Sequence, residues 1–112
     1  MSEREPLSST APAPVSVISL VDYQPRGIVS RQIVKKQAGN VTLFAFDEHE
    51  ELSEHTSPFD ALVHVLEGEA TVTIGGSPHT VPLGQMILLP AHVPHSVRAP
   101  GRFKMLLTMI RA

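Results

Sequence analysis

The chain has 112 residues, 42% of them hydrophobic and 18% charged, and a formal net charge of −2. This length and composition fit one domain with its own core, and the small negative charge excludes the basic patch that nucleic-acid binding requires. The absence of cysteine excludes disulfides and thiolate metal ligands. The sequence has neither a signal-peptide pattern nor an apolar run long enough to span a bilayer, so we expect a cytoplasmic protein with no membrane partner.

Two N-terminal segments precede the main pattern. Residues 1–14 contain three prolines and few side chains able to pack, which predicts a mobile tail followed by one domain over residues 15–112. The segment Val15–Val21 is rich in β-branched residues and partly alternating, which predicts a first strand. A long apolar strand at a sheet edge promotes pairing with another chain, so we expect a homodimer.

From Ile28 onward, short apolar runs alternate with turns rich in glycine, proline and asparagine, and no segment has a helical period with caps. The segment Asp47–Pro58 interrupts this pattern, and its acidic composition predicts a long loop. Residues 86–89 form an apolar run typical of a buried strand. The expected strands cover residues 28–36, 41–46, 59–66, 69–74, 79–81, 86–89, 94–98 and 103–110. Short strands at this spacing predict an all-β sandwich or barrel.

Strand parity predicts which side chains face the core. Side chains alternate between the two faces of a strand, and the odd positions of residues 59–66, which include Ala61, are all apolar. We therefore expect the odd face to be buried and His64 to point away from it. Met105 shares a face with Phe103, which predicts a place for Met105 in the lining of the barrel.

Two stretches of the sequence resemble the two conserved motifs of the cupin family. The first, His55–Gly68, begins with a histidine and ends in Leu-Glu-Gly, and the second, Gly84–His95, has the pattern Gly-x5-Pro-x4-His. The distance between the two stretches also resembles that of the family. The resemblance implies a single jelly-roll barrel, a double-stranded β-helix, of the small RmlC-like conserved-barrel type.

The resemblance also implies a metal pocket from which half of the ligands are missing. His55 and His95 stand at two of the four usual ligand positions, whereas Ser57 replaces a histidine and Ala61 replaces a glutamate. His92, three residues before His95 in a proline-bounded loop, is the best candidate for an additional ligand. Imidazole and carboxylate ligands suit Fe, Mn, Ni, Cu or Zn, so a divalent transition metal is the cofactor that the resemblance implies.

The expected pocket is larger and less polar than the family pattern. Alanine at position 61 neither binds a metal nor transfers a proton, and it leaves more space than glutamate. Ser57, Ala61 and Met105 are the residues expected to line the pocket beside the histidines. A loop or surface position is the simpler expectation for the remaining histidines, His49, His64 and His79.

Three functional hypotheses remain open at this stage. In the first, the chain is a metal-dependent small-molecule enzyme, such as a dioxygenase, an isomerase or a lyase. In the second, it is a metal-free module that holds a small apolar or carboxylate ligand. In the third, the barrel is only a dimerisation unit, which predicts a pocket filled by side chains. The fold does not choose among them, because one fold hosts unrelated functions, and the sequence does not decide whether the chain is an enzyme.

Overall fold

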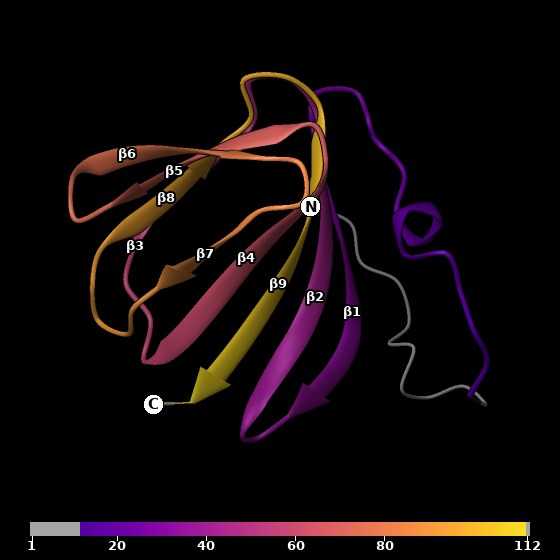
Figure 1. The fold of residues 1–112 in the computed structure, drawn as a ribbon, viewed down its shortest axis with the longest axis horizontal. Helices are drawn as coiled ribbons and strands as arrows, with labels where there is room; N and C mark the ends of the chain where they lie inside the picture. The colour runs from indigo at the N-terminus through magenta and orange to yellow at the C-terminus, as the bar shows by residue number, and fades with distance from the viewer. Residues whose placement is uncertain (1–11, 112) are drawn as a thin grey trace.

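The structure is a computed structural model that describes residues 12–111, and these residues form an all-β fold. Nine strands make two antiparallel sheets (Figure 1). The strands are β1 (Ile28–Lys36), β2 (Gly39–Phe46), β3 (Glu51–His55), β4 (Phe59–Glu67), β5 (Glu69–Ile74), β6 (Ser77–Pro82), β7 (Met86–Leu89), β8 (His95–Arg98) and β9 (Phe103–Arg111). The predicted all-β class is confirmed.

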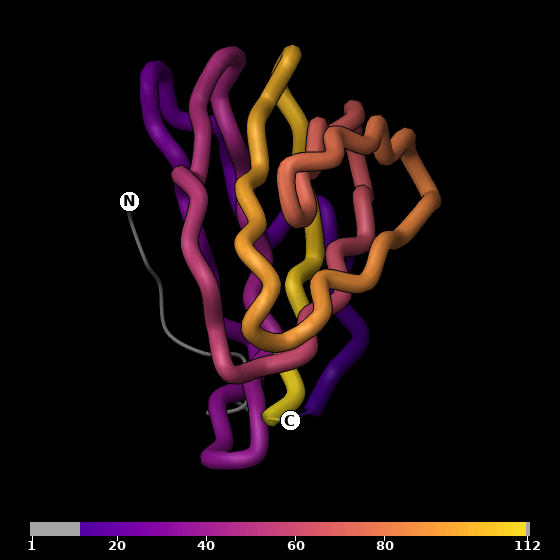
Figure 2. Tube along the Cα trace, turned by 90° about the vertical axis from the view of Figure 1, so that its left-hand side faces the viewer, coloured from indigo at the N-terminus to yellow at the C-terminus, as the bar shows by residue number. Residues whose placement is uncertain are grey.

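The two sheets face each other and enclose the core. The larger sheet has the strand order β1-β2-β9-β4-β7 and the smaller one the order β3-β8-β5-β6. Figure 2 views the protein from the side of the smaller sheet. Between the sheets, the rings of Phe46 and Phe103 stack with centroids 4.5 Å apart. Burying such large apolar side chains supplies most of the favourable free energy of a small fold.

The parity prediction for β4 is confirmed. Ala61, Val63 and Val65 are buried between the sheets, whereas the even positions of the strand are exposed or only partly buried. His64 therefore lies on the outer face of the larger sheet, away from the core. One consequence matters for the site: Ala61 presents its methyl group to the space between the sheets.

The prediction of a first strand over Val15–Val21 is wrong. Residues Val17–Leu20 form a short 3-10 helix, followed by extended chain. This segment lies along the outer face of the larger sheet (Figure 1), where Val21 is buried in a second apolar cluster with Val29 and Leu43. Of its β-branched side chains only Val21 is buried against the sheet, whereas Val15, Val17 and Ile18 are exposed, and the segment joins no ladder.

Long-range side-chain donors hold this N-terminal segment in place. The Lys104 ammonium donates to the Ile18 carbonyl at 2.6 Å, and the Arg31 guanidinium donates to the Leu20 carbonyl at 3.4 Å. The Ile18 and Leu20 carbonyls thus accept hydrogen bonds from side chains and not from a neighbouring strand. The part of the predicted tail that the structure describes, residues 12–14, is exposed and has no regular structure, and residues 1–11 lie outside the described residues.

Two further predictions about strands need correction. The segment Asp47–Pro58 is not one long loop, because β3 occupies its second half and pairs with β8. Strand β3 lies at the edge of the smaller sheet and only Leu52 is partly buried, so an apolar alternation is absent. Strand β7 is not fully buried: Met86 is 56% exposed and Leu88 51% exposed, since they face outward from an edge strand. No helix within residues 12–111 is long and apolar enough to cross a membrane.

Candidate functional site

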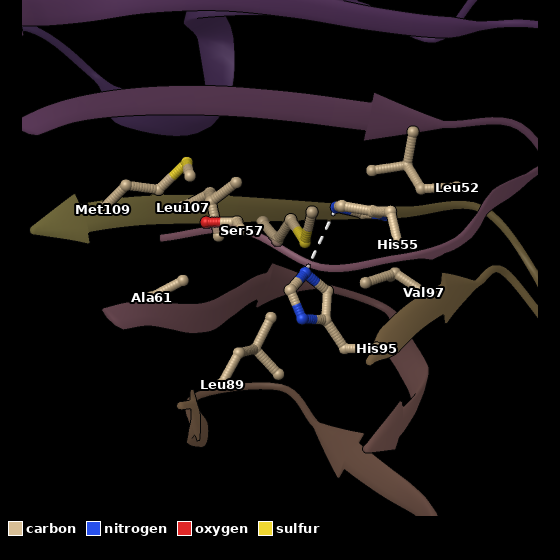
Figure 3. Close-up of a pocket in the computed structure, with 10 residues that line it drawn as sticks. Leu52, His55, Ser57, Ala61, Leu89, His95, Val97, Leu107 and Met109 are labelled. Atoms are coloured by element: carbon tan, nitrogen blue, oxygen red, sulfur yellow. Dashed lines mark hydrogen bonds between the residues drawn. The ribbon is translucent and has the colours of Figure 1, made fainter. Parts of the chain in front are cut away.

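The site is built where β3 meets β8. In this ladder His55 lies directly opposite His95, after an irregularity between Leu52 and His55. The two rings meet edge to face, with centroids 4.4 Å apart and an interplanar angle of 71°. Their Nε2 atoms are 3.2 Å apart (Figure 3). Two histidines that are 40 positions apart in the sequence thus direct the same ring nitrogen at one point.

The other ring nitrogens fix the tautomers of the pair. Nδ1 of His55 is 2.8 Å from the Ser53 carbonyl oxygen, and Nδ1 of His95 is 3.1 Å from the Val93 carbonyl oxygen. A carbonyl only accepts hydrogen bonds, so each Nδ1 carries a proton and donates it. In the neutral rings, both Nε2 lone pairs then face each other. Such a contact is stabilised only when a proton or a metal ion sits between the two nitrogens.

Burial makes the two histidines unequal. His95 is only 6% exposed, whereas His55 is exposed at the edge of the sheet. Burial lowers the pKa of His95 below its ordinary value of 6.5, and repulsion from His55 acts in the same direction. The hydrogen bond to Val93 opposes this shift without reversing it. The inner imidazole is therefore held in the neutral form, which is the form that binds metals.

The pair lies at one end of a cavity between the sheets. The cavity has about 50 Å³ of space for water-sized molecules, and with the adjoining open solvent the empty space is about 370 Å³. Its remaining walls are almost entirely apolar, and they are formed by Leu52, Ser57, Ala61, Leu89, Val97, Met105, Leu107 and Met109 (Figure 3). The three residues that the sequence analysis assigned to the pocket, Ser57, Ala61 and Met105, all line it.

Ser57 supplies the one hydroxyl group of the lining. Its Oγ accepts a hydrogen bond of 3.0 Å from the Phe59 backbone N–H. This bond closes the turn before β4, and it leaves the hydroxyl proton for another acceptor. Ser57 is thus a turn residue that also offers one donor to the cavity.

His92 does not join the pair. It is exposed, it adopts a left-handed backbone conformation with φ of 67°, and it is absent from the cavity lining. Its backbone N–H donates to the Ser57 carbonyl oxygen at 2.8 Å, so it holds two loops together at the mouth of the cavity. His49 and His79 are exposed away from the site, as expected.

The family's metal centre does not fit the side chains present. Within residues 12–111 no group of three or more histidine, cysteine, aspartate or glutamate side chains is placed to hold an ion. Two imidazoles fit one metal ion, because 3.2 Å between Nε2 atoms corresponds to an angle of about 100–105° at an ion about 2.0–2.1 Å from each nitrogen. A histidine and a carboxylate that would complete the set are replaced by Ser57 and Ala61.

Leu52, Leu89, Val97 and Met109 line the cavity but were not assigned to it from the sequence. Leu52 was assigned to a loop, and no local pattern marked it, since the rest of β3 is exposed. Met109 was not singled out, although it shares the inward parity of Met105 on β9. Extending that parity by four residues predicts Met109 as a lining residue.

The chain belongs to the cupin family. Residues 42–111 match the family described as the cupin domain. Among solved structures, a conserved protein of unknown function from Streptococcus pyogenes is 32% identical, with a TM-score of 0.87 over 92% of this chain and 90% of that one. A cupin 2 conserved-barrel protein from Leptotrichia buccalis is 39% identical, with a TM-score of 0.82 over 84% of this chain.

Other comparisons extend the fold assignment without adding an activity. This chain spans 46% of the Leptotrichia protein. A cupin superfamily protein from Desulfitobacterium hafniense is 26% identical, with a TM-score of 0.86 over 92% of this chain and 94% of that one. A search among curated proteins found no match. The predicted family and barrel are therefore confirmed: the chain is a small conserved-barrel cupin.

Proposed function

We propose that this cupin binds a compact, mostly apolar small molecule in the barrel cavity and holds one polar group of that molecule at the His55–His95 end. The observation that carries the proposal is the pair of converging Nε2 atoms at the end of an otherwise apolar cavity. Ligand sites typically combine apolar walls with a few convergent polar groups. About 50 Å³ of this space is available to water-sized molecules, so the cavity admits only a compact ligand.

The polar group of the ligand is defined by the pair's hydrogen-bonding capacity. Because both Nδ1 protons are committed to backbone carbonyls, the neutral Nε2 atoms only accept. A phenol, an alcohol or a carboxylic acid brings the missing proton and bonds directly to the pair. This metal-free binding is the first form of the proposal.

A divalent transition metal on the same two nitrogens is the second candidate, and it is favoured by the 3.2 Å spacing of the Nε2 atoms. Such an ion supplies Lewis-acid or redox chemistry, which would support dioxygenase-, isomerase- or lyase-like activity. The chain contributes two neutral imidazoles, and the cavity has no carboxylate to act as a general base. The remaining coordination positions would be occupied by water or by the ligand's own oxygen atoms.

The test is a thermal-shift screen of chelator-treated protein with small phenols and organic acids, each with and without added Zn²⁺, Mn²⁺, Ni²⁺ or Fe²⁺. A ligand at 100 times its Kd stabilises the folded state by about 2.7 kcal/mol, which shifts the Tm of a domain of this size by several degrees. Stabilisation by organic ligands alone supports metal-free binding, and stabilisation only with metal supports the second candidate. The control variant His79→Ala, at an exposed position away from the cavity, should keep every shift, whereas His95→Ala should lose it. No shift with any compound would refute the proposal.

A further inference from the structure

The side chains of the cavity that could bind a metal differ chemically from the histidines and carboxylate that the family resemblance implies. The carboxylate position is filled by Ala61, and β9 brings two methionines, Met105 and Met109, to the same cavity. The third methionine in the described part of the chain, Met86, points outward on β7. Besides the Ser57 hydroxyl, the potential metal donors of the lining are thus two imidazole nitrogens and two thioether sulfurs, with no carboxylate among them.

The register of the larger sheet places the two methionines at different positions along the cavity. Met109 lies opposite Ala61, and Met105 lies opposite Val65, four residues closer to the start of β9. Figure 3 shows the Met109 side chain at the end of the cavity away from His55 and His95. Met105 is fully buried and lines the same cavity as the pair. A methionine side chain has three rotatable bonds and adapts to irregular space.

The geometry of the pair suits a bent two-nitrogen site with a third position open toward the cavity. An angle of about 100–105° at the ion, inferred from the 3.2 Å spacing, is far from the 180° of a linear two-coordinate complex. The open side of such an ion faces apolar walls and thioethers. Soft thioether ligands select Cu(I), whereas carboxylate and water ligands suit the harder divalent ions.

We infer that this site is built for a cuprous ion, bound by Nε2 of His55, Nε2 of His95 and the thioether of Met105. The inference rests on the proposed use of the His55–His95 pair as the polar end of the site, and it names the ion that this end prefers. The walls stabilise Cu(I) further, because they offer no carboxylate oxygen to an oxidised, harder ion. Binding requires no electron transfer when the ion is supplied as Cu(I).

The experiment is an anaerobic titration of the metal-free full-length protein with Cu(I), in competition with a chromophoric Cu(I) chelator, next to parallel titrations with Zn²⁺ and Mn²⁺. We expect one Cu(I) per chain, and an affinity at least 100-fold above that for Mn²⁺. Met105→Leu should weaken Cu(I) binding at least tenfold and leave Zn²⁺ binding within threefold. Met109→Leu is the matched control, with the same change of side chain on the same strand, and should leave both affinities unchanged.

A second readout separates ligation from packing. X-ray absorption at the copper edge should detect a sulfur neighbour in the native protein and in Met109→Leu, but not in Met105→Leu. Thermal melting of each metal-free variant checks that the fold is intact, and leucine nearly conserves the volume of methionine. Equal Cu(I) affinity in Met105→Leu and native protein, or Zn²⁺ binding as tight as Cu(I) binding, would overturn the inference.

The outcomes also distinguish this inference from the proposed function. If organic ligands stabilise the metal-free protein and Cu(I) does not bind, the copper site is refuted and small-molecule binding stands. If Cu(I) binds with the expected dependence on Met105 while no organic compound shifts the Tm, the copper site stands and small-molecule binding is refuted.

Discussion

Ala61 lies directly opposite Met109 in the ladder between β4 and β9. A methyl group and a thioether therefore stand side by side in the cavity wall, at the place where the family resemblance puts a carboxylate ligand. Both side chains line the cavity that contains the histidine pair (Figure 3). Alanine in place of glutamate at position 61 affects the metal preference and polarity of the site more than any other substitution. A carboxylate there would favour hard metal ions and would make the cavity wall polar.

A carboxylate at position 61 should shift the metal preference of the site from Cu(I) toward divalent ions. In Ala61→Glu, we expect the affinity for Mn²⁺ and Zn²⁺ to rise at least tenfold, because a carboxylate joins two imidazoles. Without metal the variant should melt at a lower temperature, since a buried carboxylate without partners costs several kcal/mol. Isothermal titration calorimetry and thermal melting measure the two effects. Ala61→Gln is the control, with similar size and no charge, and an equal gain of metal affinity in that variant would contradict this account.

Protonation of His95 should make stability depend on pH. Its folded-state pKa is lowered by burial from the ordinary value of 6.5, so the unfolded chain binds a proton more readily than the folded chain. The corresponding stability is fully present above about pH 6.5 and is lost as the pH falls from there to the folded-state pKa. Urea unfolding of metal-free protein at a series of pH values between 7.5 and 5 measures this loss. The non-titrating variant His95→Asn should show a flatter profile, and identical slopes would contradict the assignment.

Most of the fold is predictable from local patterns, and each failure has its own physical cause. Residues 28–36, 69–74 and 86–89 match β1, β5 and β7, because apolar runs and turn residues mark these strands locally. Strand β3 was missed because an exposed edge strand needs no apolar alternation. The 3-10 segment Val17–Leu20 was mistaken for a strand because its partners on β1 and β9 are distant in the sequence.

The site, too, was predictable where a local pattern marks the residue and not where the backbone conformation decides its direction. The motif positions predicted His55 and His95, and the structure brings them together, with Ser57, Ala61 and Met105 in the same cavity. His92 was assigned by proximity in sequence, but its left-handed backbone turns the loop so that this side chain does not line the cavity. Backbone conformation of this kind is not encoded in residue spacing.

The turn between β4 and β5 should tolerate no side chain at Gly68. The backbone there has φ of 72°, and an added Cβ would lie 2.3 Å from the Arg102 carbonyl oxygen. The left-handed conformation costs about 1–2 kcal/mol for a residue with a Cβ, and the clash should raise the total for Gly68→Ala to about 3 kcal/mol or more. Gly76→Ala is the matched control, because φ is 84° but nothing lies within 4 Å of the added atom. Chemical denaturation should separate the two variants, and equal losses would contradict the role of the contact.

The outer face of β7 should determine whether the chain self-associates. Met86 and Leu88 are exposed there, next to His64 and Leu62 of β4 in the ladder. Exposed, contiguous apolar side chains of this kind are unusual on a monomer. We therefore retain the predicted homodimer, although its original basis, a strand over Val15–Val21, is wrong.

Light scattering after gel filtration should thus give about twice the chain mass of 12.1 kDa for the native protein. Leu88→Lys should shift the protein toward the monomer, because a lysine on this face would have to be desolvated in the contact. Leu83→Lys is the control: Leu83 is 63% exposed but lies in the turn before β7, so its replacement should leave the mass unchanged. A native protein that elutes as a monomer at micromolar concentration would refute the dimer, and a dimer unaffected by Leu88→Lys would place the contact on another face.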